Sequence, residues 1–277
     1  MGFVFNIKVH SATRHGEQIL YSLFQKIHKD KLRFPISGDR EMAIRTFFKS
    51  EVNNIPIAYG KLVSAIDLGD GDWLNLDKME DEKYDVPRNL RAKPKEARYI
   101  LVPSAHRVFI QTGSENKISI HHCRYFLENA LTEVLRKEEE VEVIIQTDSD
   151  VIDRIFEASA VESLTIAISR SNNDTNKDAE KWFEDQLDEM HASRFDAKIT
   201  APKNKEGLNL ENKFLKGAIN LAPQNGKVDA KIIDAEGKTE IIKTEDHPKK
   251  YSISVEDKEN PIQDVAKRIL SLFRPRK

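Results

Sequence analysis

Residues 121–170 read HHCRYFLENALTEVLRKEEEVEVIIQTDSDVIDRIFEASAVESLTIAISR, and the rest of the chain is organised around this stretch. It begins with a segment of helical periodicity, in which Phe126, Leu127 and Val134 share one face. The apolar run VEVIIQ follows, then a short helix, and then the β-branched run LTIAIS. This succession of helices and strands indicates an α+β fold.

The N-terminal side predicts a mixed module of one strand, one helix and antiparallel hairpins. The run FVFNIKVH alternates large apolar residues with others, as a half-buried strand does. A turn at Asn53-Asn54 separates two runs of strand formers, and Gly60 weakens the second run or marks a bulge. Residues 68–87 are expected to form a surface excursion that Trp73 and Leu74 hold down. The remaining expectations here are a helix over 16–29, a break at 34–40 and a hairpin over 99–113.

The C-terminal side predicts a module of alternating helices and strands. Four charged residues at 137–140 interrupt the apolar pattern, so we place a soft boundary there, with modules at 1–138 and 139–277. One continuous domain is the alternative. The expected helices are 174–191, 208–221 (ending before Pro223) and 262–273, and the expected strands are 195–201, 228–234, 238–244 and 251–255.

Composition excludes several classes of protein. With 39% apolar and 32% charged residues, the chain of 277 residues fits a soluble globular class. It contains no apolar run of 18 residues, so no membrane insertion is expected. Cys123 is the only cysteine, which excludes an internal disulfide and a cysteine-rich zinc site, and it makes a cytoplasmic location the simplest expectation.

No motif for catalysis or cofactor binding stands out, and we expect no cofactor and no metal. His121-His122-Cys123 either begins a helix or holds a surface ion or a reactive thiol. Gly69-Asp70-Gly71-Asp72 is expected to be an ordinary turn, because it lacks the lysine of a phosphate-binding loop. Asp196-Ala197-Lys198 and Asp229-Ala230-Lys231 have the Asp-x-Lys spacing of metal-dependent nucleases, a spacing that exposed strands share.

The clearest binding signal is a local excess of cations in a chain of net charge −2. Acidic residues predominate from Asp67 to Asp85, and basic residues predominate from Arg88 to Arg107. Phosphate recognition needs such cation arrays, because affinity grows with the number of counterions released. Tyr99 and His106 either stack on a base or pack in the core. The predicted phosphate contacts are Arg88, Arg91, Lys93, Lys95, Arg98 and, as an addition, Arg170.

Several short segments carry a resemblance to a known family. Phe34-Pro35-Ile36-Ser37-Gly38-Asp39-Arg40, Asp72-Trp73, 86–91, 153–156 and 164–172 together resemble an uncharacterised bacterial family of similar length, catalogued as a domain of unknown function. The layout is also similar, more distantly, to the phage-exclusion protein RexA and the Kiwa defence component KwaB. That resemblance implies anti-phage defence, self-association and DNA binding without strong sequence preference. Gly38-Asp39-Arg40 is either a site or a turn in which Arg40 pairs with an acid.

These observations predict a non-enzymatic nucleic-acid-binding protein of bacterial anti-phage defence, acting as a homodimer. DNA is the expected nucleic acid, and a defence partner protein is a further candidate. Two alternatives stay open. One is a metal-dependent nuclease or toxin effector that uses the Asp-x-Lys strands. The other is a protein–protein adaptor that docks through the acidic segment 67–85.

Overall fold

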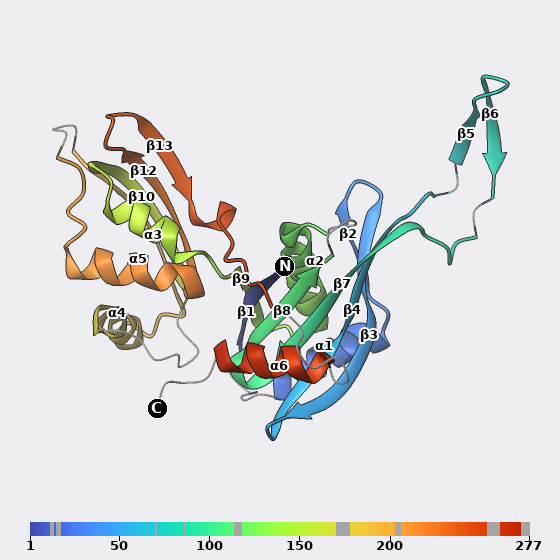
Figure 1. The fold of residues 1–277 in the computed structure, drawn as a ribbon, viewed down its shortest axis with the longest axis horizontal. Coiled ribbons are helices and arrows are strands. Elements are labelled where there is room, and N and C mark those ends of the chain that lie inside the picture. The colour runs from blue at the N-terminus through green and yellow to red at the C-terminus, as the bar shows by residue number, and fades with distance from the viewer. Residues whose placement is uncertain are drawn as a thin grey trace.

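The computed structural model contains two large antiparallel β-sheets that lie side by side, each with helices packed on it, and a separate two-stranded hairpin (Figure 1). It describes residues 1–11, 14, 18–69, 71–85, 87–113, 118–169, 178–202, 206–253 and 261–272. These residues form six α-helices and thirteen strands, which confirms the α+β class. None of the helices in these described residues has the length and hydrophobicity that a membrane span requires.

The larger sheet has seven strands and carries helices on both faces (Figure 1). In order across the sheet, the strands are β2 (Arg33–Ser37), β3 (Arg40–Val52), β4 (Ile55–Ile66), β7 (Ala92–Val102), β8 (Arg107–Thr112), β1 (Gly2–His10) and β9 (Glu140–Ile145). Helices α1 (Gln18–Lys29) and α2 (Ile120–Val134) cover one face, and α6 (Pro261–Leu272) packs on part of the other.

Helix α6 changes the burial of the first strand. The alternating pattern predicts that β1 is half-buried, with Phe5 and Ile7 facing the core. These two residues do pack under α1 and α2, but Val4 is also fully buried, in the core beneath α6. Strand β1 is therefore buried on both faces, which its own period could not reveal because α6 comes from the far end of the chain.

The smaller sheet has four strands, with its three helices on one face. Its strands, in order across the sheet, are β11 (Arg194–Thr200), β10 (Ala160–Ser169), β12 (Gly226–Ile233) and β13 (Thr239–Lys243). The helices are α3 (Ser149–Phe156), α4 (Asp178–Glu189) and α5 (Lys213–Asn225). Helix α5 begins later than predicted, where the Asn212 side chain accepts from two backbone N–H groups, and it includes Pro223 in its last turn.

Buried polar contacts join the two sheets. The ammonium group of Lys8, which is fully buried in β1, donates to the carbonyl of Ser169 at the end of β10, at 2.8 Å. The Asn6 amide donates to the Gln224 carbonyl at 2.9 Å. Two elements from the second half of the sequence also join the larger sheet: strand β9 forms one of its edges, and helix α6 packs on one of its faces.

The predicted hairpins are present, and their turns explain them. Asn53 and Asn54 both have positive φ (52° and 61°), which suits the two-residue turn between β3 and β4. A short 3-10 turn, Pro103–Ala105, joins β7 to β8. The expected break at 34–40 is instead the edge strand β2 and its turn. Pro35 is tolerated there because an edge strand has a side without ladder hydrogen bonds.

Residues 68–87 leave the larger sheet, as predicted, and fold into a separate hairpin of β5 (Gly71–Asn75) and β6 (Glu80–Tyr84) (Figure 1). The prediction that Trp73 and Leu74 hold this segment down is wrong. Their exposed fractions are 37% and 53%, because the hairpin extends away from both sheets.

Candidate nucleic-acid interface

The predicted basic stretch begins at the base of the β5–β6 hairpin, where one of its arginines is already neutralised. The Arg91 guanidinium donates to Glu41 at 3.0 Å and pairs with Asp67 at 2.7 Å, and only 19% of its side chain is exposed. Arg88 is exposed, and its backbone carbonyl accepts from Arg91. Arg91 therefore anchors the connection between β6 and β7 to β3 and to the end of β4.

Strand β7 divides the remaining predicted cations between two faces of the sheet. Lys95 lies two residues before Ala97, whose side chain packs in the core under α1 and α2. Arg98 lies two residues before Ile100, which packs in the core under α6. Successive side chains in a strand point to opposite faces, so Lys95 and Arg98 cannot contact the same phosphate strand. Arg170 lies outside the described residues.

The Gly38-Asp39-Arg40 segment is a turn, with Gly38 at a φ of +52°. Arg40 does not pair with a carboxylate within the described ranges. Its guanidinium donates to the hydroxyl of Ser64 at 3.0 Å and to the carbonyls of Ser64 and Lys93. This arginine fixes the backbone of Lys93 and leaves the exposed Lys93 side chain outside any cluster with Arg98.

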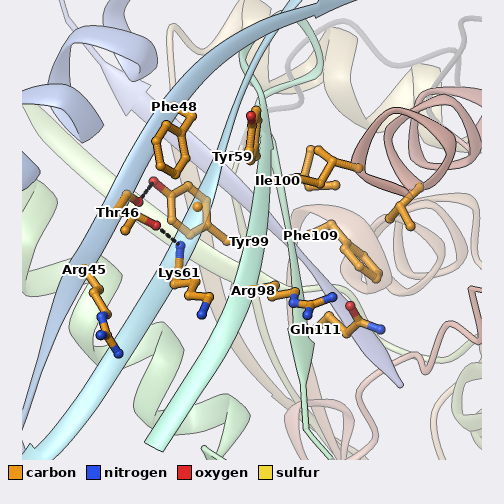
Figure 2. A pocket seen from close by; sticks show the side chains of 13 residues that line it. Arg45, Thr46, Phe48, Tyr59, Lys61, Arg98, Tyr99, Ile100, Phe109 and Gln111 are labelled. Carbon is orange, nitrogen blue, oxygen red and sulfur yellow. Dashed lines mark hydrogen bonds between the residues drawn. The ribbon is translucent and has the colours of Figure 1, made fainter. Parts of the chain in front are cut away.

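A hollow with a volume of about 560 Å³ lies on the α6 face of the larger sheet. We call it the groove. Figure 2 shows side chains from four neighbouring strands converging on it. Its lining is mostly apolar or aromatic, with cations along one side. The lining residues are Arg45, Thr46 and Phe48 of β3, Tyr59, Gly60 and Lys61 of β4, Arg98, Tyr99 and Ile100 of β7, Phe109 and Gln111 of β8, and Ile262 and Val265 of α6.

Three cations enter the groove, against one carboxylate. Glu96 pairs with both Arg45 and Lys61, and the Lys61 ammonium lies 2.8 Å from it. The hydrogen bond from Lys61, together with the charge of Arg45, lowers the pKa of Glu96, so this carboxylate stays ionised. Arg98 is exposed and has no carboxylate partner among the described residues. The groove therefore has a net positive charge.

Two aromatic rings line the groove beside these cations. Phe48 and Tyr59 face each other across the β3–β4 pair, with ring centroids 5.4 Å apart. Phe48 is 51% exposed, which is unusual for a phenylalanine. Tyr99 lies beneath them, fully buried, and donates its hydroxyl to the Thr46 carbonyl at 3.0 Å. Burial raises the pKa of Tyr99, which is consistent with a packing role.

A second hollow adjoins the groove and shares Lys61, Arg98 and Gln111 with it. Its volume is about 420 Å³. The two hollows meet at these side chains, across β4, β7 and β8, and we call the two together the nucleotide track. Arg98 lies in both parts. It is the only predicted phosphate contact that lines either hollow.

The other candidate sites have structural explanations. His121-His122-Cys123 forms the first turn of α2, and burial raises the pKa of the Cys123 thiol to about 12, which makes it unreactive. His106 lies in the β7–β8 turn and does not line the groove. In the described residues, no three His, Cys, Asp or Glu side chains are placed to hold a metal.

The two Asp-x-Lys triplets share the open face of the smaller sheet but do not form a carboxylate pair. Strand β10 lies between Asp196 and Asp229, and they pair with residues two apart on it, Ala167 and Thr165, so their Cα atoms are about 12 Å apart. Arg194 binds Asp196 at 2.6 Å and lowers its pKa. Burial raises the pKa of Asp229. The carboxylates therefore have different environments, and neither lies next to another acid on its strand.

A search of curated proteins finds no significant match. The model of a protein family described as a domain of unknown function, DUF4747, matches residues 3–271, which is nearly the whole chain. The chain therefore belongs to the DUF4747 family.

Proposed function

We propose that the protein binds single-stranded nucleic acid in the groove, without catalysing a reaction on it. The observation that carries this proposal is the aromatic pair of exposed Phe48 and half-buried Tyr59, beside the cations Lys61 and Arg98 on one sheet face. Aromatic side chains stack on unpaired bases, and adjacent cations bind the phosphates between them. The resemblance to RexA and KwaB supports a role in anti-phage defence as part of the same proposal.

A single strand fits the groove better than a duplex does. The bases of a duplex are stacked on one another, so their faces cannot reach an aromatic side chain on a sheet. Cavities of 300–1,000 Å³ typically hold drug-sized ligands, so about 560 Å³ accommodates roughly one nucleotide. The adjoining hollow then receives the next nucleotide along the strand, with Gln111 available to hydrogen-bond a base edge.

The salt dependence of binding separates the roles of the two kinds of side chain. Fluorescence anisotropy with labelled oligothymidine measures the Kd at a series of salt concentrations, for the wild type and for the variants Arg98→Ala and Phe48→Ala. Arg98→Ala should reduce the slope of log Kd against log salt by about 0.7, because one phosphate contact is lost. Phe48→Ala should weaken binding by roughly 5- to 100-fold and leave that slope unchanged, because stacking releases no counterion.

Arg88→Ala is the matched control, since Arg88 is an exposed arginine outside the groove. The Arg88→Ala variant should have the affinity of the wild type and the same slope of log Kd against log salt. An Arg88→Ala variant that loses as much affinity as Arg98→Ala would contradict the proposal and favour the base of the β5–β6 hairpin. Tighter binding of a duplex of the same length than of the single strand would also contradict it.

A further inference from the structure

The hairpin Gly71–Tyr84, which we call the arm, projects from the larger sheet (Figure 1). In the described residues its two strands pair only with each other. An isolated two-stranded hairpin is at best marginally stable in water, so it gains stability by packing against another surface. The arm therefore has the properties of a docking element that lacks its partner in the single chain.

The tip of the arm presents large apolar side chains on an ordered turn. Leu76 and Met79 are 76% and 71% exposed. The side-chain oxygen of Asn75 accepts from the backbone N–H groups of Asp77 and Lys78, at 3.0 and 3.2 Å. The backbone carbonyl of Asn75 accepts from the backbone N–H of Met79 at 2.7 Å. Such a preorganised turn loses little conformational entropy when it docks.

The arm and the groove are complementary in charge as well as in polarity. The arm contains five acidic residues and two lysines, and Asp77, Glu80 and Asp81 are exposed around its tip. The groove combines an apolar wall, which includes Ile262 of α6, with the cations described above. Opposite charges at the rim steer two surfaces together, and buried apolar side chains supply most of the affinity.

The arm cannot reach the groove of its own chain. It leaves the sheet after Ile66 and returns at Ala92, six residues from Arg98, which is about 20 Å along the strand. It then extends farther away from the groove (Figure 1). A second copy of the chain can supply the missing arm, and two copies related by a twofold axis would exchange arms in a closed dimer.

We propose that the arm of one copy lies in the groove of a second copy, with Leu76 and Met79 against its apolar wall and the tip carboxylates against Arg98 and Lys61. This docking stands without the proposed nucleic-acid binding. One consequence rests on that function: the acidic arm occupies the nucleotide track, so nucleic acid and the partner's arm compete for the groove. In the dimer, the partner's arm therefore excludes nucleic acid from the groove.

Sedimentation equilibrium of the full chain tests the docking. The double variant Leu76→Ser/Met79→Ser should weaken dimerisation by at least about a hundredfold, because each fully buried Leu or Met contributes about tenfold or more to the association constant. The matched control is Met190→Ser/Ile241→Ser, which changes two side chains of comparable exposure (57% and 64%) in the part of the chain that forms the smaller sheet and its helices. This control should dimerise as the wild type does. A monomeric wild type, or a tip variant that dimerises as the wild type does, overturns the proposal.

Complementary charge reversal tests the pairing of the two surfaces. Asp77→Arg/Glu80→Arg in the arm and Arg98→Glu in the groove should each weaken self-association. An equimolar mixture of the two variants should dimerise again, because each arm then meets a groove of opposite charge. No recovery in the mixture overturns the pairing. Oligonucleotide binding does not enter either readout, so failure of the proposed function leaves this result interpretable.

Discussion

Replacing Gly60 by alanine is expected to lower the free energy of unfolding by about 3 kcal/mol or more. A Cβ atom at this position would lie 1.9 Å from the carbonyl oxygen of Thr46 and 3.0 Å from the Tyr99 hydroxyl. The first of these atoms belongs to the backbone of the neighbouring strand and cannot rotate away. The register of β3 against β4 shifts between Ile44 and Thr46, so the bulge brings this carbonyl over Gly60.

Thermal unfolding followed by circular dichroism measures the effect of Gly60→Ala. A loss of 3 kcal/mol corresponds to a fall in Tm of about 6–12 °C for a protein of this size. Gly113→Ala is the matched control, because a Cβ at Gly113 meets nothing within 4 Å and its φ is not in the positive range. Equal Tm values for the two variants would show that the bulge yields easily, and would contradict the close approach described above.

Replacing Glu139 by glutamine is expected to lower the free energy of unfolding at pH 7 by about 2–3 kcal/mol, because the Arg14 guanidinium loses its carboxylate partner. The Glu139 carboxylate is fully buried. It accepts from Arg14 Nε at 2.6 Å, from the Ser11 hydroxyl at 2.9 Å and from the backbone N–H of Arg136 at 3.0 Å. These contacts connect the end of β1 to the loop between α2 and β9.

The stabilisation by Glu139 should depend on pH. The hydrogen bond from Arg14, with those from Arg136 and Ser11, lowers the pKa of Glu139 from 4.5 to about 2. A carboxyl whose pKa is lower in the folded state stabilises the fold above its unfolded pKa, and this contribution is lost as the pH falls through the folded pKa. The difference in unfolding free energy between the wild type and Glu139→Gln should therefore shrink as the pH falls from about 4.5 towards 2.

Urea titrations followed by tryptophan fluorescence at a series of pH values measure this difference. Glu138→Gln is the control, because Glu138 is the adjacent glutamate and its side chain is exposed. It should match the wild type at every pH. A gap between the wild type and Glu139→Gln that stays constant from neutral pH to pH 3 would show that the charge of Glu139 does not stabilise the fold.

Much of the larger sheet could be predicted from the sequence, because local patterns determine it. The Asn53-Asn54 turn fixes the register of β3 against β4 and places Phe48 opposite Tyr59. The aromatic pair could thus have been found by counting back from the turn. The second buried face of β1 could not, because the helix that covers it lies some 250 residues away in the sequence.

The candidate site was predicted only in part, for a related reason. The basic stretch is continuous in sequence, but strand alternation sends Lys95 and Arg98 to opposite faces. The carboxylates that neutralise Arg91 come from β3 and from the end of β4, far along the chain. Charge along a sequence therefore predicts a charged segment. Which of its cations gather on one surface depends on pairing between distant strands.

Photo-cross-linking shows where on the protein unpaired bases bind, and so tests whether they bind in the groove. The complex of the full chain with oligothymidine is irradiated and digested with trypsin, and the modified peptides are identified by mass spectrometry. We expect nucleotide adducts on peptides 46–49 and 50–61, which contain Phe48 and Tyr59. Adducts confined to the smaller sheet, or to the connection around Arg88, would contradict binding in the groove.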